Sequence, residues 1–116
     1  MHDGVDIVDA LNSAMAAANA AIRSLAEHGR AKAEAEGRYR MALAKKELEL
    51  RADGKLPASL VHDVAKGDET VARLYVKWVC AESIYDQTRE EIMYRKREAD
   101  VCREQLAREW SQAGSR

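Results

Sequence analysis

Three histidines are the first residues of this chain to consider as metal ligands or general bases. His2, His28 and His62 lie far apart, and none has a Cys, Asp or Glu at the spacing of a zinc or iron site. The chain also has no Gly-rich phosphate loop, no nucleophile elbow and no HExxH motif. We therefore predict no catalytic, cofactor-binding or metal-binding residues. The protein is expected not to be an enzyme unless several chains assemble a site between them.

The two cysteines are too far apart to bond to each other within one helix. Cys80 and Cys102 are 22 residues apart, which is roughly 33 Å of continuous helix and too long for a disulfide. Cys102 falls at a position where a small buried side chain is expected. A redox link through Cys102 between symmetry-related chains is an alternative. We expect a reduced, intracellular setting.

One basic cluster has an aromatic neighbour. Arg95, Lys96 and Arg97 follow Tyr94, and Arg89 lies one or two turns earlier. Such a cluster could contact phosphate and stack on a base. Three nearby glutamates dilute it, and the net charge of −1 argues against a nonspecific nucleic-acid coat. A salt-bridged, solvated helix face is the preferred interpretation, and nucleic-acid binding through these four basic residues is the alternative.

The elements that carry these residues are predicted to be helical. The chain is 47% apolar, but twenty-one residues are alanine and none is phenylalanine. Alanine favours helix strongly and buries little surface, and burial stabilises by roughly 25 cal/mol per Å². A hairpin with such a core should be marginal alone, so we expect self-association or a partner.

A break near the midpoint divides the chain into two long helices. Residues 53–57, Asp-Gly-Lys-Leu-Pro, contain the only proline. We predict an all-α single domain over 1–116: a long helical hairpin of two antiparallel, coiled-coil-like helices at about 5–52 and 69–111, with a short corner helix at about 58–66.

Single residues mark where these helices begin, end or bend. Gly67 is typical of the turn after a helix, and Asp68 is a good N-cap for the helix that follows. Gly29 costs about 1 kcal/mol relative to alanine inside a helix. A kink or short break is therefore expected near Gly29.

The downstream helix carries the clearest periodicity. One residue every three or four positions forms a stripe, and nine of its twelve members are apolar, as expected of a packed seam. The members are Val71, Leu74, Trp78, Ala81, Tyr85, Thr88, Ile92, Arg95, Ala99, Cys102, Leu106 and Glu109.

The upstream helix is predicted to present two apolar faces. Its main stripe is interrupted in the middle and comprises Val8, Leu11, Met15, Ala18, Ile22, Leu25, Tyr39, Leu43 and Leu50. A second line lies nearly opposite and comprises Gly37, Met41, Ala44 and Leu48. A helix with two apolar faces is usually sandwiched between neighbours. The second neighbour is either the corner helix or another chain.

We therefore expect this protein to work by binding other helices. A homo-oligomer is favoured, with a further protein partner from phage or host, and the proposed assembly residues are Tyr39, Met41, Leu43, Leu48, Leu74, Trp78, Tyr85 and Ile92. No run approaches the ~20 apolar residues of a membrane span. The first residues are acidic where an export signal would be basic. No membrane partner is expected.

The middle of the chain resembles small helical proteins encoded by phages and prophages. The resemblance rests on Tyr-Arg-Met-Ala-Leu-Ala-Lys at 39–45, Leu-Arg-Ala-Asp-Gly at 50–54, Asp63 to Glu69, and the later 71–74 and 81–85 segments. It covers roughly residues 36–106. It implies an accessory protein from an early, replication or recombination, gene region in the cytoplasm of a bacterial host. It transfers no catalytic residue.

A second resemblance is to the hairpin substrates of type VII secretion. Tyr94 and Glu98 match their YxxxE pattern, and the chain is similar to them in length and hairpin architecture. Their Trp-x-Gly turn is missing, because the turn here reads Asp53-Gly54-Lys55. A secreted hairpin is the weaker alternative.

Overall fold

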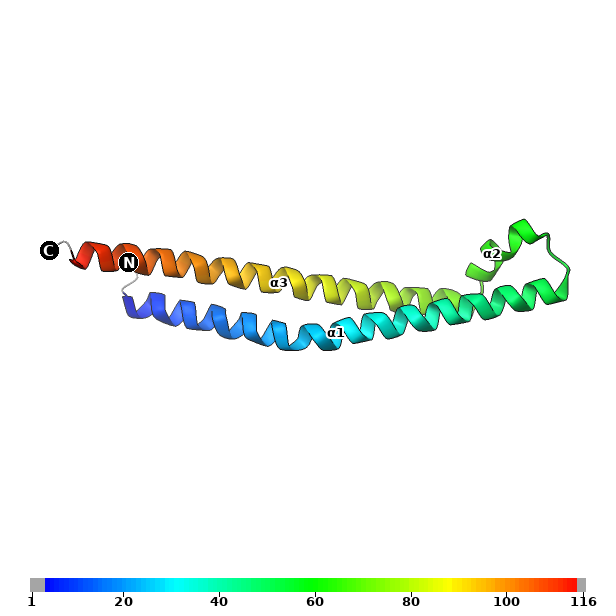
Figure 1. The fold of residues 1–116 in the computed structure, drawn as a ribbon, viewed down its shortest axis with the longest axis horizontal. Coiled ribbons are helices and arrows are strands. Elements are labelled where there is room, and N and C mark those ends of the chain that lie inside the picture. The colour runs from blue at the N-terminus through cyan, green and yellow to red at the C-terminus, as the bar shows by residue number, and fades with distance from the viewer. Residues whose placement is uncertain (1–3, 115–116) are drawn as a thin grey trace. The chain divides into compact units, whose positions relative to one another are not determined.

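The computed structural model describes residues 4–114, and within that range the chain is helical with no strand. Helix α1 is Gly4–Asp53, α2 is Ala58–Lys66 and α3 is Glu69–Gly114 (Figure 1). The all-α prediction is confirmed. The two long helices pack against each other, and the short helix α2 lies between them in the chain (Figure 1).

The helices form two compact units. The terminal unit contains residues 4–26 of α1 and 86–114 of α3, and the corner unit contains residues 27–85. In the terminal unit, Arg103 Nη2 lies 3.7 Å from Met15 Sδ. In the corner unit, Lys32 pairs with Glu82 at 3.8 Å and Lys46 with Asp68 at 3.6 Å. The α1 and α3 segments of the corner unit therefore run antiparallel.

Helix α1 is unbroken from Gly4 to Asp53, so the short break expected near Gly29 is absent, while the kink stays a prediction. A Cβ at Gly29 would lie 3.4 Å from the Tyr85 ring, so the glycine leaves room for that ring beside the helix. Lys32 Nζ lies 5.0 Å from the centroid of the same ring. These contacts within the corner unit offset the poor helix propensity of glycine.

Gly54 is the residue that ends α1. It adopts a φ of 70°, and its amide donates to the Leu50 carbonyl at 3.4 Å. This is the left-handed conformation that glycine adopts readily after a helix. Gly67 also follows a helix, but its φ is −81°, which any residue can adopt. The conformational need for glycine therefore lies at 54, not at 67.

Asp68 caps α3 as predicted. Its Oδ2 accepts hydrogen bonds from the amides of Thr70 at 3.1 Å and Val71 at 3.2 Å. These amides would otherwise lack partners at the helix start. Asp68 Oδ1 also faces Lys46, so the cap ties the beginning of α3 to α1.

The predicted seam of α3 is confirmed, because all twelve of its residues are buried or half-buried. The predicted stripe of α1 is partly wrong in the terminal unit. Leu11, Ala18 and Leu25 are buried or half-buried, whereas Val8, Met15 and Ile22 are at least 40% exposed. The adjacent residues Ile7, Ala14 and Ala21 are buried instead. Two of these three buried residues are alanine, whereas all three exposed residues have larger side chains.

The core of the described residues is thin. Half of the ten buried apolar residues are alanine, and the largest side chains that are fully buried are those of Val61 and Val71. Sixteen large apolar residues remain exposed. Since stabilisation scales with buried apolar area, much of the apolar surface contributes nothing to the stability of a single chain. No helix in residues 4–114 combines the length and apolarity that crossing a membrane requires.

Candidate interaction surfaces

An aromatic cluster joins the two long helices of the corner unit. The ring centroids of Tyr39 and Trp78 are 5.5 Å apart in a stacked arrangement, and Tyr75 lies edge-on to both, at 5.4 and 5.9 Å. Arg40 covers the Trp78 ring at 5.6 Å and donates from Nε to Glu36 at 2.8 Å. Stacked and edge-on pairs add roughly 0.5–1.5 kcal/mol each beyond burial. The cluster therefore holds this unit together.

The aromatic cluster also reaches the surface. Tyr75 is 47% exposed, although Tyr39 is buried. The Trp78 indole Nε1 is buried and has no hydrogen-bond acceptor. An unsatisfied buried donor costs about 1–3 kcal/mol, so packing at Trp78 is retained despite a polar penalty.

The proposed assembly residues divide into two groups. Six lie in the seams between α1 and α3, where they hold a single chain together: Tyr39, Leu43, Leu74, Trp78 and Tyr85 in the corner unit and Ile92 in the terminal unit. Met41 and Leu48 are different, because they are 75% and 65% exposed. Only these two members of the set are fully available to another molecule.

The corner helix α2 does not cover Met41 and Leu48. It buries Val61 and Ala65, and its His62 Nδ1 lies 2.5 Å from Glu47 Oε1. Glu47 is on a different side of α1 from the Met41–Leu48 line, since adjacent residues on a helix are about 100° apart. Within the described residues, the second apolar face of α1 is therefore open.

The basic cluster does not form one face of the terminal unit. Arg95 is half-buried in the seam, donates to Glu98 at 2.9 Å and covers the Tyr94 ring at 5.3 Å. The hydrogen bond to Glu98 raises the pKa of Arg95 above its ordinary value, so Arg95 stays cationic. Lys96 and Arg97 line two different hollows.

Arg89, the fourth residue of the nucleic-acid alternative, is exposed on α3 of the terminal unit. Nucleic-acid binding by the cluster as a whole stays a prediction.

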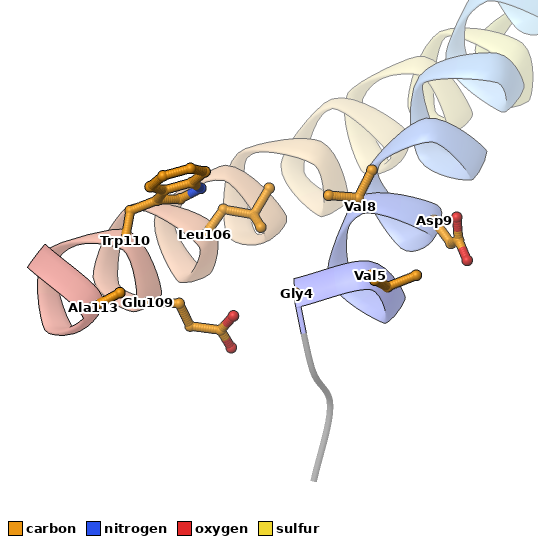
Figure 2. A pocket seen from close by; sticks show the side chains of 8 residues that line it. All are labelled: Gly4, Val5, Val8, Asp9, Leu106, Glu109, Trp110 and Ala113. Carbon is orange, nitrogen blue, oxygen red and sulfur yellow. The ribbon is translucent and has the colours of Figure 1, made fainter.

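Two hollows lie along one side of the terminal unit. The larger has a volume of 610 Å³ and is lined by Val5, Val8, Leu106 and Trp110, among others. Figure 2 shows Trp110 beside Leu106 on α3, with Val8 across from them on α1. The smaller, of 290 Å³, is lined by Met15, Ile22, Lys96 and Arg103, among others.

The sequence signal for this groove was the spacing of seven residues. Val8, Met15 and Ile22 share one face of α1, and Lys96, Arg103 and Trp110 share one face of α3. The stripe predicted for α1 includes Val8, Met15 and Ile22, and the structure instead turns these three side chains outward into the two hollows.

The remaining chemistry-bearing residues are dispersed. Cys80 is exposed in the corner unit and Cys102 is half-buried in the terminal unit. His28 is half-buried, and His2 lies outside the described residues. Residues 4–114 contain no group of three or more His, Cys, Asp or Glu side chains placed to hold a metal.

Comparisons with protein-family models, curated proteins and solved structures find no match to this chain. Its function must therefore be argued from its own surfaces.

Proposed function

We propose that this protein is a non-enzymatic accessory protein that acts by helix-mediated protein binding, and that it does so as a homo-oligomer of coiled-coil-like hairpins. The observation that supports this is the exposure of Met41 and Leu48, 75% and 65%, on the face of α1 that points away from α3. Large apolar side chains aligned on one helix face are typical of a docking surface.

The small residues on the same face of α1 favour a second copy of this chain as the molecule that covers Met41 and Leu48. Gly37, Met41, Ala44 and Leu48 alternate small and large. If two α1 helices cross antiparallel about a two-fold axis between residues 42 and 43, Met41 faces the second copy's Ala44. Leu48 then faces the second copy's Gly37. Each large side chain meets a small one, and both contacts occur twice, as in an isologous interface.

Charge on the same register adds to this arrangement. The two-fold axis that pairs Met41 with Ala44 also places Glu34 opposite the second copy's Arg51. Arg38 and Lys45 flank the apolar line with like charges, and their long side chains can extend into solvent. The contact is therefore small and apolar at its centre, with an ion pair at each end.

The phage or prophage setting of this proposal is supported by the residue pattern between Tyr39 and Tyr85. In that setting the protein partner would come from the phage or its host. Presentation of a helical face would be the mechanism. The Met41–Leu48 surface is the place where such a partner and a second copy would compete.

Light scattering across a dilution series tests self-association. We expect a particle of about twice the 13.0 kDa chain mass that dissociates on dilution. Met41→Glu should yield a monomer, because it places a charge in the apolar contact. Val76→Glu is the matched control, since Val76 is 58% exposed on α3 of the same unit; this variant should still associate.

A wild-type protein that stays at 13.0 kDa at every concentration would contradict self-association. The remaining test would be binding to a different protein. A partner should co-purify with the wild type after nuclease treatment and at moderate salt, and it should be lost in Met41→Glu. If neither association is observed, the proposed function is wrong.

A further inference from the structure

A second surface lies in the terminal unit, away from Met41 and Leu48. We define the lateral groove as the two hollows on the side of this unit where α1 contributes Val8, Met15 and Ile22 and α3 contributes Lys96, Arg103 and Trp110. On each helix these residues are seven positions apart, so they form one line along each wall. Val8 to Ile22 spans about 21 Å of helix, or about four turns.

The walls of the lateral groove are apolar on α1 and cationic on the facing part of α3. Met15 and Ile22 are 40% and 45% exposed, and Trp110 at the end is 77% exposed. Across from them, Lys96 and Arg103 line the middle hollow. The groove thus offers an apolar line about as long as a short amphipathic helix.

The ionic groups along the groove are not uniform. The middle hollow is lined by Arg95, Lys96 and Arg103 and by one carboxylate, Asp100, while Arg95 also pairs with Glu98 outside the lining. Arg103 Nη1 donates to Asp100 at 3.1 Å. The end hollow carries Asp9 and Glu109 instead. Charge therefore changes sign along the groove, from net positive in the middle to negative at the end.

We propose that the lateral groove docks an amphipathic helix of another protein, one that carries acidic residues beside its apolar line. Two carboxylates seven residues apart on that helix would face Lys96 and Arg103. A basic residue one heptad further would face the end that holds Asp9 and Glu109. The apolar line of the helix would cover Met15, Ile22 and Trp110. This surface is distinct from the one in the proposed function and does not depend on it.

A second copy of this chain fits the groove less well. Its matching acidic and apolar line on α3 comprises Glu91, Tyr94, Glu98 and Val101. This line lies on the far flank of α3 from Lys96 and Arg103. Docking it would join opposite flanks of successive copies, and a contact of that kind is heterologous and gives open chains instead of a closed dimer. The chemistry therefore points to a different protein.

Fluorescence anisotropy with two designed peptides tests the proposal. Both have three heptads with leucine at the apolar positions. One carries glutamate beside the apolar line and the other carries lysine. We expect the purified full-length protein to bind the glutamate peptide at least about tenfold more tightly than the lysine peptide.

Variants of the full chain locate the binding. The double variant Lys96→Glu/Arg103→Glu should bind the glutamate peptide about tenfold or more weakly than the wild type does, and it should prefer the lysine peptide. The matched control is Arg97→Glu/Arg108→Glu, which makes the same change in net charge away from the lateral groove and should leave the peptide preference unchanged.

Asn19→Glu tests the α1 wall, because Asn19 is an exposed residue that lines the middle hollow. This variant should also weaken binding of the glutamate peptide. Circular dichroism checks that each variant is helical.

Three results would overturn the proposal. The first is equal binding, or no binding, of the two peptides by the wild-type protein. The second is glutamate-peptide binding that survives Lys96→Glu/Arg103→Glu. The third is a single-stranded DNA oligonucleotide that binds in place of the peptide and is lost in the same variant, which would assign these cations to nucleic acid. Met41→Glu should leave peptide binding intact, so failure here is distinguishable from failure of self-association.

Discussion

At the scale of single residues, Trp78 shows packing and hydrogen bonding in conflict. Its ring is stacked on Tyr39 and covered by Arg40, while its Nε1 has no acceptor. The packing gain must exceed the polar cost, because the ring remains in the seam. Arg95 Nε, in the terminal unit, is likewise buried without a hydrogen bond, although the Arg95 guanidinium donates from Nη1 to Glu98.

Two substitutions at Trp78 separate these contributions. Trp78→Phe keeps an aromatic ring against Tyr39 and removes the unsatisfied donor, so unfolding free energy should change by less than about 1 kcal/mol. Trp78→Ala also removes the stacked area and should cost about 2–3 kcal/mol. Urea denaturation followed by circular dichroism measures both. Equal losses in the two variants would contradict the assignment of stability to the ring.

At the scale of elements, glycine has opposite effects inside α1 and directly after its end. Gly37 lies inside the helix, and a Cβ there would meet nothing within 4 Å. Gly54 ends the helix with a φ of 70°. The first position needs no glycine for the fold of one chain, whereas the second does.

The matched pair Gly37→Ala and Gly54→Ala should therefore shift stability in opposite directions. Gly37→Ala should stabilise by about 0.5–1 kcal/mol because it raises helix propensity. Gly54→Ala should destabilise by about 1 kcal/mol or more because it strains the left-handed turn. Thermal melts of the Met41→Glu background, where self-association is removed, give the cleanest comparison. A lower Tm for Gly37→Ala in that background would contradict the stabilisation expected from helix propensity.

At the scale of the whole molecule, stability and association are expected to be coupled. Few large side chains are fully buried among residues 4–114, and many are exposed. A chain of this kind gains stability from any partner that covers its apolar faces, by mass action. The alanine-rich seam is compatible with the fold but leaves the single chain marginal.

The Tm of the wild-type protein should accordingly rise with protein concentration. In Met41→Glu the Tm should be independent of concentration and close to the wild-type value at high dilution, because Met41 contributes little to the fold of one chain. Differential scanning calorimetry over a broad concentration range measures this. A wild-type Tm that does not change with concentration would argue against a folding-linked oligomer.

The sequence alone determined the helices, the turn at Gly54, the Asp68 cap and the whole seam of α3. These features depend on local propensity and on a strict 3-4 spacing, which act within one helix. The sequence also shows the Met41–Leu48 line, since both faces of α1 near it are apolar.

Only the tertiary structure decided which side of α1 faces α3 in the terminal unit. Two apolar stripes one residue apart share Leu11, Ala18 and Leu25, and periodicity does not distinguish them. In the structure the stripe with Ile7, Ala14 and Ala21 is buried, and Val8, Met15 and Ile22 face outward, where they line the lateral groove. The structure likewise shows where the basic cluster lies relative to the seam. Arg95 is in the seam, and Lys96 and Arg97 line two different hollows, because successive residues on a helix point about 100° apart.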